Sequence, residues 1–270
     1  MATVGTNVAS LNATFFLTVN NESLSKSIRR LSSGSRLADP SDDAAGVAVS
    51  GRLDATVKRL VAAVEGSQNL VSFAQTTDGF LKTIQEQLTR MSELAQRATN
   101  GAFGSADRAN YATEFEILKT QIAQFATNAV FNGTRLFPSA ATSVSVAINS
   151  EGSTDSFYTG PLQIETQFLA GASIDTTQAA TSAITVITSA LSAITTRRAT
   201  VNTDISKFNF HITNIRTERI NVEAANSRIK DLDVAAETAN LSKANILLQA
   251  STAMLAQANT SQQTVLSLLR

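Results

Sequence analysis

The chain has 270 residues, and its 22 basic and 22 acidic side chains leave it without net charge. Because it has no net positive charge and no basic run, neither nucleic acid nor an anionic membrane is an implied partner. Cysteine is absent and histidine occurs once, which excludes disulfide scaffolds, thiolate metal sites, Cys–His catalytic pairs and His-rich metal centres.

The N-terminal segment Met1–Thr6 has neither the basic nor the apolar region of a secretory signal peptide. No stretch reaches the roughly 18 consecutive apolar residues of a membrane span. We therefore expect no membrane insertion and, for a chain that leaves the cell, a route without a cleavable signal.

The first predicted helix covers residues 11–31. Its apolar face consists of Leu17, Leu24, Ile28 and Leu31. Gly34 and Pro40 end it, and Ser41–Asp43 offers capping oxygens and acidic first-turn residues to the next helix.

The second predicted helix carries a long series of apolar residues at steps of three and four, from Leu53 to Ala95. Only Ser67 and Asp78 interrupt the apolar character of this series. Turn-forming glycines after residue 100 separate it from a third helix, which ends near Ala129. The third helix is marked by Tyr111, Phe115, Leu118, Ile122 and Phe125.

Residues 140–170 have a different pattern, in which apolar and polar side chains alternate. The alternation occurs at Val144, Val146 and Ile148, and again at Leu162 and Ile164. The intervening segment Asn149–Asp155 is rich in turn formers. The pattern predicts a short β-hairpin with these two apolar groups in its strands.

No glycine or proline occurs from Ala172 to Arg270. Apolar residues recur there at steps of three and four up to Ile229, with polar gaps at Arg198, Arg219 and Asn226. A continuous helix of about fifty residues is about 75 Å long, which predicts an elongated, mainly α antiparallel helical bundle or coiled coil.

The step of five residues from Ile229 to Val234 rotates the apolar face out of phase. Together with the break near residues 32–43, it predicts two modules: a rod domain of residues 41–231 and an inner domain of residues 1–40 and 232–270. Short isolated helices are marginal in water. We therefore expect the inner-domain helices to bury their apolar stripes against other copies of the chain, although a self-contained helical hairpin is the alternative. The expected assembly residues are Leu17, Leu24, Ile28, Leu31, Leu241, Leu248, Leu255, Val265 and Leu269.

Several segments resemble bacterial flagellins. At the N-terminal side these are Arg30-Leu-Ser-Ser-Gly-Ser-Arg36, Ser41-Asp-Asp-Ala-Ala-Gly46, Ala74-Gln-Thr-Thr-Asp78 and Phe131-Asn-Gly-Thr134. At the C-terminal side they are Ser227-Arg-Ile-Lys-Asp-Leu-Asp233 and the run from Leu255 to Arg270. The resemblance covers about residues 1–135 and 175–270, and it is specific at both ends.

The resemblance implies a structural subunit of a flagellar filament for motility, secreted unfolded through a type III apparatus and located outside the cell. It also implies a chaperone, hook-junction proteins and cap proteins as partners. The outer domains of larger flagellins are expected to be absent, because only about forty residues occupy their place. A hook–filament junction protein and a surface adhesin or glycan-binding module remain alternatives, the latter with Phe157 and Tyr158 as its only aromatic cluster.

In flagellins, a vertebrate innate receptor of the Toll-like family recognises one face of the rod domain. Arg90, Leu94 and Glu114 occupy the matching positions, whereas Arg97 stands where recognised flagellins usually have Gln. The sequence is equally compatible with ordinary solvated helix residues at these positions.

We expect no enzymatic activity, no cofactor and no metal site. The single histidine, His211, lies between two apolar residues of the long helix, as a packing or surface residue does. The carboxylates of Asp42-Asp43 and of Asp231 and Asp233 are better explained by helix capping than by metal binding.

Overall fold

The computed structural model describes residues 6–162, 164 and 168–267. The chain divides into two compact units, one of residues 57–220 and one formed by the chain ends, up to residue 56 and from residue 221. The predicted mainly α class is confirmed. Helices dominate both units, and two small antiparallel sheets accompany them.

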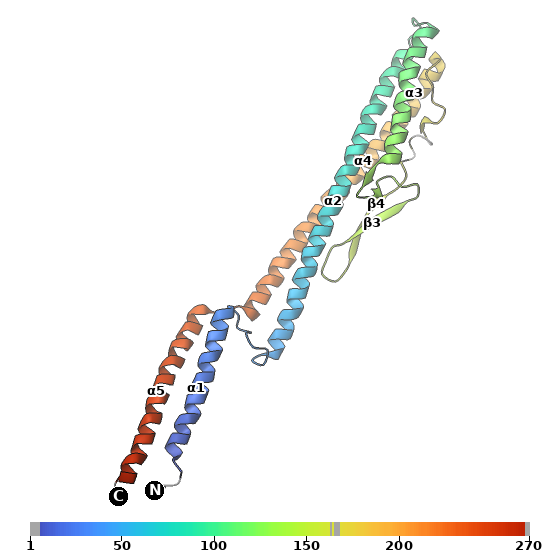
Figure 1. Cartoon of the computed structure of the whole chain (residues 1–270). Coiled ribbons are helices and arrows are strands. Elements are labelled where there is room, and N and C mark those ends of the chain that lie inside the picture. Colours follow the sequence, from blue (N-terminus) through green and yellow to red (C-terminus); the bar gives the residue numbers. More distant parts are fainter. Residues whose placement is uncertain (1–5, 163, 165–167, 268–270) are drawn as a thin grey trace. The chain divides into compact units, whose positions relative to one another are not determined.

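Three helices build the unit of residues 57–220: α2 (Ala44–Ala98), α3 (Ser105–Asn128) and α4 (Thr177–Lys230). In Figure 1, α3 lies beside the upper part of α2, α4 runs along α2, and both are antiparallel to it. The periodic positions of the sequence form one core, because steps of three and four keep side chains on one helix face. Fully buried members include Leu81, Ile84, Leu88, Met91, Phe115, Ile187, Ile194 and Phe208.

The polar gaps in the seams of α2 and α4 face each other. The Arg198 guanidinium donates from Nε to Asp78 Oδ1 at 2.8 Å and from Nη2 to Asp78 Oδ2 at 3.1 Å. It also donates to Gln85 Oε1 at 2.9 Å. The hydrogen bond to Asp78 raises the pKa of Arg198 and keeps it charged in spite of its desolvation. A two-pronged ion pair therefore replaces apolar packing at this level of the bundle.

Of the described helices, α4 alone is long and apolar enough to cross a membrane by length and composition, with a window of mean hydropathy 1.4. A core helix meets the same criterion. Packing covers one face of α4, at Ala180, Ala183, Ile187, Ala190 and Ile194, and 28% of the apolar window is buried.

The hairpin predicted for residues 140–170 exists, but its second strand was predicted in the wrong place. Strand β3 (Thr142–Ala147) pairs with β4 (Thr154–Thr159), whereas Leu162 and Ile164 lie beyond β4. The turn occupies only residues 148–153, so β4 begins within Asn149–Asp155, the segment that was predicted to be the turn. Phe157 and Thr159 then provide the buried side of β4. A smaller hairpin, β1 (Val130–Phe131) with β2 (Thr134–Arg135), turns at Asn132 and Gly133 with φ of 46° and 80°.

Polar contacts from Asp155 fasten the larger hairpin to α4. Its carboxylate lies 3.2 Å from Lys207 Nζ and 3.0 Å from His211 Nε2. His211 is therefore half-buried against a strand residue, as expected for a packing residue. On the apolar side, the rings of Phe157 and Phe73 meet edge to face with centroids 5.7 Å apart.

We predict that acid loosens this hairpin. Although partial burial raises the pKa of Asp155, hydrogen bonds from the Ser156 N–H, Lys207 and His211 outweigh it and hold the pKa below its ordinary value. Stability linked to this carboxylate is therefore present above its unfolded pKa of about 3.9 and is lost as the pH falls through the lower folded pKa. Because the intrinsic rate of amide exchange itself falls in acid, the quantity to compare is the protection factor of residues 142–159, which is expected to decrease as the pH falls. Asp155→Asn is expected to show the lower protection at neutral pH already, and protection like the parent's there contradicts the prediction.

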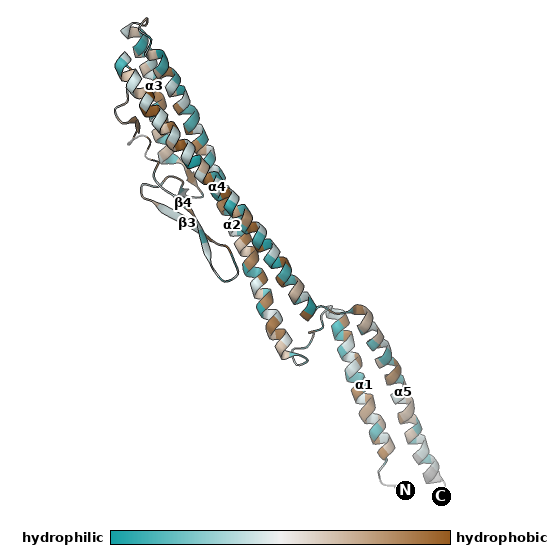
Figure 2. Cartoon of the chain, turned by 180° about the vertical axis from the view of Figure 1, so that it is seen from behind, coloured by the Kyte–Doolittle hydropathy of each residue, from teal (hydrophilic) through white to brown (hydrophobic). Residues whose placement is uncertain are grey.

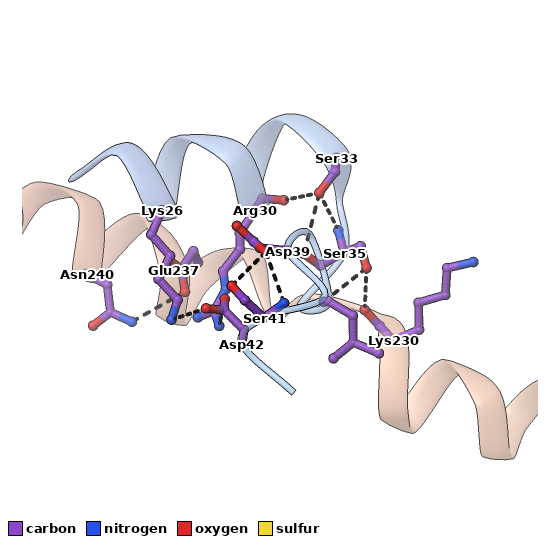
Figure 3. A network of polar contacts seen from close by, with 11 residues as sticks. Lys26, Arg30, Ser33, Ser35, Asp39, Ser41, Asp42, Lys230, Glu237 and Asn240 are labelled. Carbon is purple, nitrogen blue, oxygen red and sulfur yellow. Dashed lines mark hydrogen bonds and ion pairs between the residues drawn. The ribbon is translucent and has the colours of Figure 1, made fainter. Parts of the chain in front are cut away.

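The unit of the chain ends contains α1 (Val8–Ser33), α5 (Val234–Ser267) and the adjoining turns of α2 and α4. α4 ends and α5 begins around the predicted phase slip. A single antiparallel bridge joins Ser35 to Asp231, and the Arg36 N–H donates to the Lys230 carbonyl at 2.8 Å. The Ser35 hydroxyl donates to the same carbonyl at 3.2 Å (Figure 3). Both breaks in the helical pattern are thus tied to each other.

The acidic residues at these breaks act as caps and ion-pair partners. Asp43 Oδ1 accepts from the Gly46 N–H at 2.8 Å, and Asp233 Oδ1 accepts from the N–H groups of the second and third residues of α5 at 3.0 Å. Asp42 lies 2.7 Å from Lys26 and 3.0 Å from Arg30, as Figure 3 shows. Within the described residues, no group of three or more His, Cys, Asp or Glu side chains has the arrangement of a metal site.

Candidate assembly surface of the terminal helices

Helices α1 and α5 lie side by side and antiparallel (Figure 1). Polar contacts between them recur along their length. Asn20 Nδ2 donates to Ser251 Oγ at 2.7 Å, and Asn7 Nδ2 donates to the Ala258 carbonyl at 3.1 Å. These contacts join residues more than 200 positions apart in the sequence.

The pair has almost no apolar core of its own. Among the described side chains of α1 and α5, those that are fully buried are Ser27, Glu237, Ala244 and Ser251. Three of these four are polar and the fourth is alanine. Because burial of large apolar side chains is the main favourable term in folding, this pair alone lacks the usual source of stability.

The predicted assembly residues lie mostly on the half-buried sides of the two helices. Ile28 is exposed, and Leu269 lies outside the described residues, as does the side chain of Val265. The half-buried members are Leu17, Leu24, Leu31, Leu241, Leu248 and Leu255. In a two-helix unit, half-buried positions are those turned toward the partner helix, so these leucines contribute mainly to pairing within the chain.

A second set of apolar residues remains exposed on the outer faces. Phe15, Ile246 and Met254 have exposed fractions of 64%, 65% and 65%. The complete set comprises Val8, Leu11, Phe15, Phe16, Val19 and Ile28 on α1, and Val234, Ile246, Leu247 and Met254 on α5. Figure 2 shows the corresponding apolar colouring along both helices.

A groove of about 680 Å³ runs between the two helices within this apolar surface. Phe16 of α1 and Leu247 and Met254 of α5 contribute its large apolar side chains. Alanines and five polar residues make up the rest of its lining: Ala9, Ala13, Ala250, Ala258, Asn12, Asn20, Ser251, Gln257 and Ser261. An apolar surface of this extent marks an interaction site. The sequence pattern did not predict this groove, because apolar steps of three and four select a single helix face, whereas α5 has apolar residues on several faces.

The three residues of the predicted receptor patch have different environments. Arg90 and Glu114 form a two-pronged ion pair between α2 and α3, with Nε to Oε1 at 2.8 Å and Nη2 to Oε2 at 3.2 Å. The hydrogen bonds that Arg90 donates to Glu114 and then to Glu93 raise the pKa of Arg90. Leu94 has no exposed surface, and Arg97 is exposed. Arg90, Glu114 and Arg97 can therefore contact a partner directly, whereas Leu94 cannot.

Comparison with known sequences identifies two matching regions. Residues 4–142 match the bacterial flagellin N-terminal helical region, and residues 184–269 match the bacterial flagellin C-terminal helical region. A flagellar filament 30.7 kDa core protein of Treponema maltophilum is 34% identical, covering 97% of this chain and 98% of that protein. A flagellin of Halalkalibacterium halodurans is 33% identical, covering 98% of each.

Solved structures agree in fold. The Bacillus cereus flagellin covers 60% of this chain and 94% of its own, with a TM-score of 0.50 and 24% identity. A putative flagellar hook-associated protein of Vibrio parahaemolyticus covers 70% of this chain and 100% of its own, with a TM-score of 0.61 and 14% identity. At such identities the likeness concerns the fold alone.

Proposed function

Because this chain belongs to the bacterial flagellin family, we propose that its terminal helices complete their folding only when copies assemble into a filament. The chain is a structural subunit of the flagellar filament and serves motility. No observation favours a hook–filament junction protein or an adhesin.

The observation that carries this proposal is the contrast between the two units. Residues 57–220 have a continuous core of large apolar side chains, whereas the α1–α5 pair buries one alanine and three polar residues. Its leucines at the helix–helix contact are only half-buried, and its other large apolar residues are exposed. Neighbouring copies that cover these faces supply the burial that the pair lacks, so that folding and assembly become one step.

Within this proposal, residues 1–40 and 232–270 form the inner domain of the filament and residues 41–231 form the rod domain. The subunit leaves the cell unfolded through the flagellar type III apparatus, with a chaperone, hook-junction proteins and cap proteins as partners. The marginal stability of the terminal pair supports this route, because a segment without a core is easily kept unfolded.

Hydrogen exchange of the purified chain before and after polymerisation tests the proposal. In the monomer, amides of residues 8–33 and 234–267 are expected to exchange freely, while those of the core of residues 57–220 are protected. In the filament, both sets are expected to be protected. Full protection of the terminal helices in the monomer contradicts coupled folding, and failure of the chain to form uniform fibres in precipitating salt contradicts the filament subunit itself.

We also propose that a Toll-like receptor has only a reduced contact surface on this chain, made by the Arg90–Glu114 ion pair. The buried Leu94 offers it no surface, and Arg97 adds a charge where recognised flagellins usually have Gln. Weak activation is expected in a receptor reporter assay, with a further fall for Arg90→Ala and a gain for Arg97→Gln. An unchanged response in both variants contradicts this assignment.

A further inference from the structure

Phe210 is the most exposed large apolar side chain in the described part of the chain, at 72%. It lies on the solvent face of α4, while its neighbours Phe208 and Ile212 point into the core. An aromatic ring left in water at the middle of a long helix forgoes the favourable free energy that its burial would supply. Nothing in the core of the unit requires it to be aromatic.

The helix surface around Phe210 carries one charge, that of Lys207, which is already paired with Asp155 and Asp204. The uncharged residues on the same face are Ser206, Thr213 and Asn214 one turn away, and Thr203 and Thr217 one turn further. All five are exposed. A partner for this surface must therefore present an uncharged, partly apolar face, because burying an unpaired charge is costly.

The same unit contains such a face on α2 and the two hairpins. A groove of about 240 Å³ lies there, too large for one water molecule, whose share of the liquid volume is about 30 Å³. The rings of Phe73 and Phe131 meet edge to face within its lining, with centroids 5.7 Å apart. None of the lining residues is charged: Gly66, Asn69, Leu70, Phe73, Phe131, Asn132, Thr134, Val144, Ser145 and Val146.

Two other grooves of this unit are less suited to a ring. The groove on α3 includes Glu116 and Asp175, whose charges a buried ring would desolvate. The groove at Phe80 and Phe125 has three side-chain amides among its five lining residues. The groove at Phe73 is the one that combines an apolar lining with aromatic edges, which favour edge-to-face packing of a further ring.

We propose that Phe210 of one copy inserts into the Phe73–Phe131 groove of a neighbouring copy in the filament. This proposal rests on the chain's role as a filament subunit. Each copy presents one ring and one groove at different places, so the contact is heterologous, which is the kind of contact that a filament requires. The ring acts as an apolar anchor on a mainly uncharged surface.

The absence of cysteine from the chain makes a cross-linking test clean. Thr213→Cys places a thiol one turn from Phe210 and leaves the Phe210 ring unchanged. Asn69→Cys places a thiol in the lining of the Phe73–Phe131 groove. Filaments assembled from an equal mixture of these two variants are treated with a short bifunctional thiol reagent and analysed on denaturing gels. The matched control uses Thr188→Cys in place of Thr213→Cys. Thr188 is also exposed, but it lies about 37 Å closer to the N-terminal end of α4.

Dimers are expected from the Thr213–Asn69 mixture, and not from the control mixture or from the unpolymerised monomers. Equal cross-linking of the two mixtures, or none in either, overturns the contact. Failure of the mixtures and of the parent chain to polymerise would instead remove the filament role, and this proposal with it.

A second measurement uses the ring itself. Phe210→Ser is expected to raise the critical concentration for polymerisation about tenfold to hundredfold, and Phe210→Leu by less. The helical content of the monomer is expected to stay the same in both variants, because the ring is exposed. A critical concentration equal to that of the parent chain in Phe210→Ser overturns the proposal.

Discussion

Met254→Asp is expected to abolish filament formation while leaving the unit of residues 57–220 folded. Met254 is 65% exposed in the single chain and lines the apolar groove between α1 and α5. Assembly that buries this surface would have to desolvate a carboxylate without a partner, which costs several kcal/mol or forces it to take up a proton. Sedimentation and electron microscopy measure polymerisation, and far-UV circular dichroism measures the helical content.

Three further substitutions separate the causes. Met254→Leu keeps the apolar surface and is expected to polymerise like the parent chain, whereas Met254→Asn removes apolar surface without adding charge and is expected to fall between the two. Leu248→Asp strikes the half-buried side of α5 and is expected to abolish filaments by breaking the α1–α5 pair itself. Normal filaments from Met254→Asp mean that the exposed face is not an assembly surface.

The sequence predicted the bundle well because its seams have a strict local signature. The steps of three and four along α2 and α4 identify buried residues such as Leu88 and Ile187, and the change of phase after Ile229 marks the break between α4 and α5. These features depend only on which residues share a helix face.

The second strand of the larger hairpin was harder to locate, because two neighbouring segments both have the residue pattern of a strand. Leu162 and Ile164 alternate with polar residues as a strand does, yet β4 is built around the fully buried Phe157. What decides between the two positions is the contact of the Phe157 ring with Phe73, which lies 84 positions earlier in the sequence. A local pattern does not contain such a contact.

The assembly surface shows the same limit in another form. The series that includes Leu248 and Leu255 lies on the half-buried side of α5, and the adjacent Ile246, Leu247 and Met254 stay uncovered. A helix that is apolar on several faces needs partners on several sides. The sequence therefore indicates that α5 is buried in the assembly, but the chain's own fold is needed to tell which face remains for other copies.

Leu94 illustrates a related point about surfaces inferred from resemblance. Its position in the sequence matches a receptor patch, but it is also one step along the core face of α2 from Met91, and both side chains are fully buried. Whether such a residue is accessible depends on how α3 covers α2, which the alignment of motifs does not include.

Loss of the ion pair between Asp78 and Arg198 is expected to lower the stability of the folded chain substantially. Asp78→Ala leaves the Arg198 guanidinium without its two charged hydrogen bonds in a partly buried seam, since the two side chains are 22% and 27% exposed. The free energy of unfolding is expected to fall by about 1.5–3 kcal/mol, the range for a hydrogen bond to a charged group. Urea denaturation followed by circular dichroism gives this value.

Replacing both residues by leucine is expected to recover most or all of that loss, because a well-packed apolar pair at such a site is often as stable as the ion pair. The double variant lacks the two-pronged ion pair, whose geometry fixes one axial alignment of α2 against α4. Without it, the two helices could shift by one turn and still keep apolar residues in contact. We therefore expect the Asp78→Leu, Arg198→Leu chain to be stable as a monomer but to form fewer or irregular filaments. Regular filaments from this variant would show that the apolar seam alone sets the register.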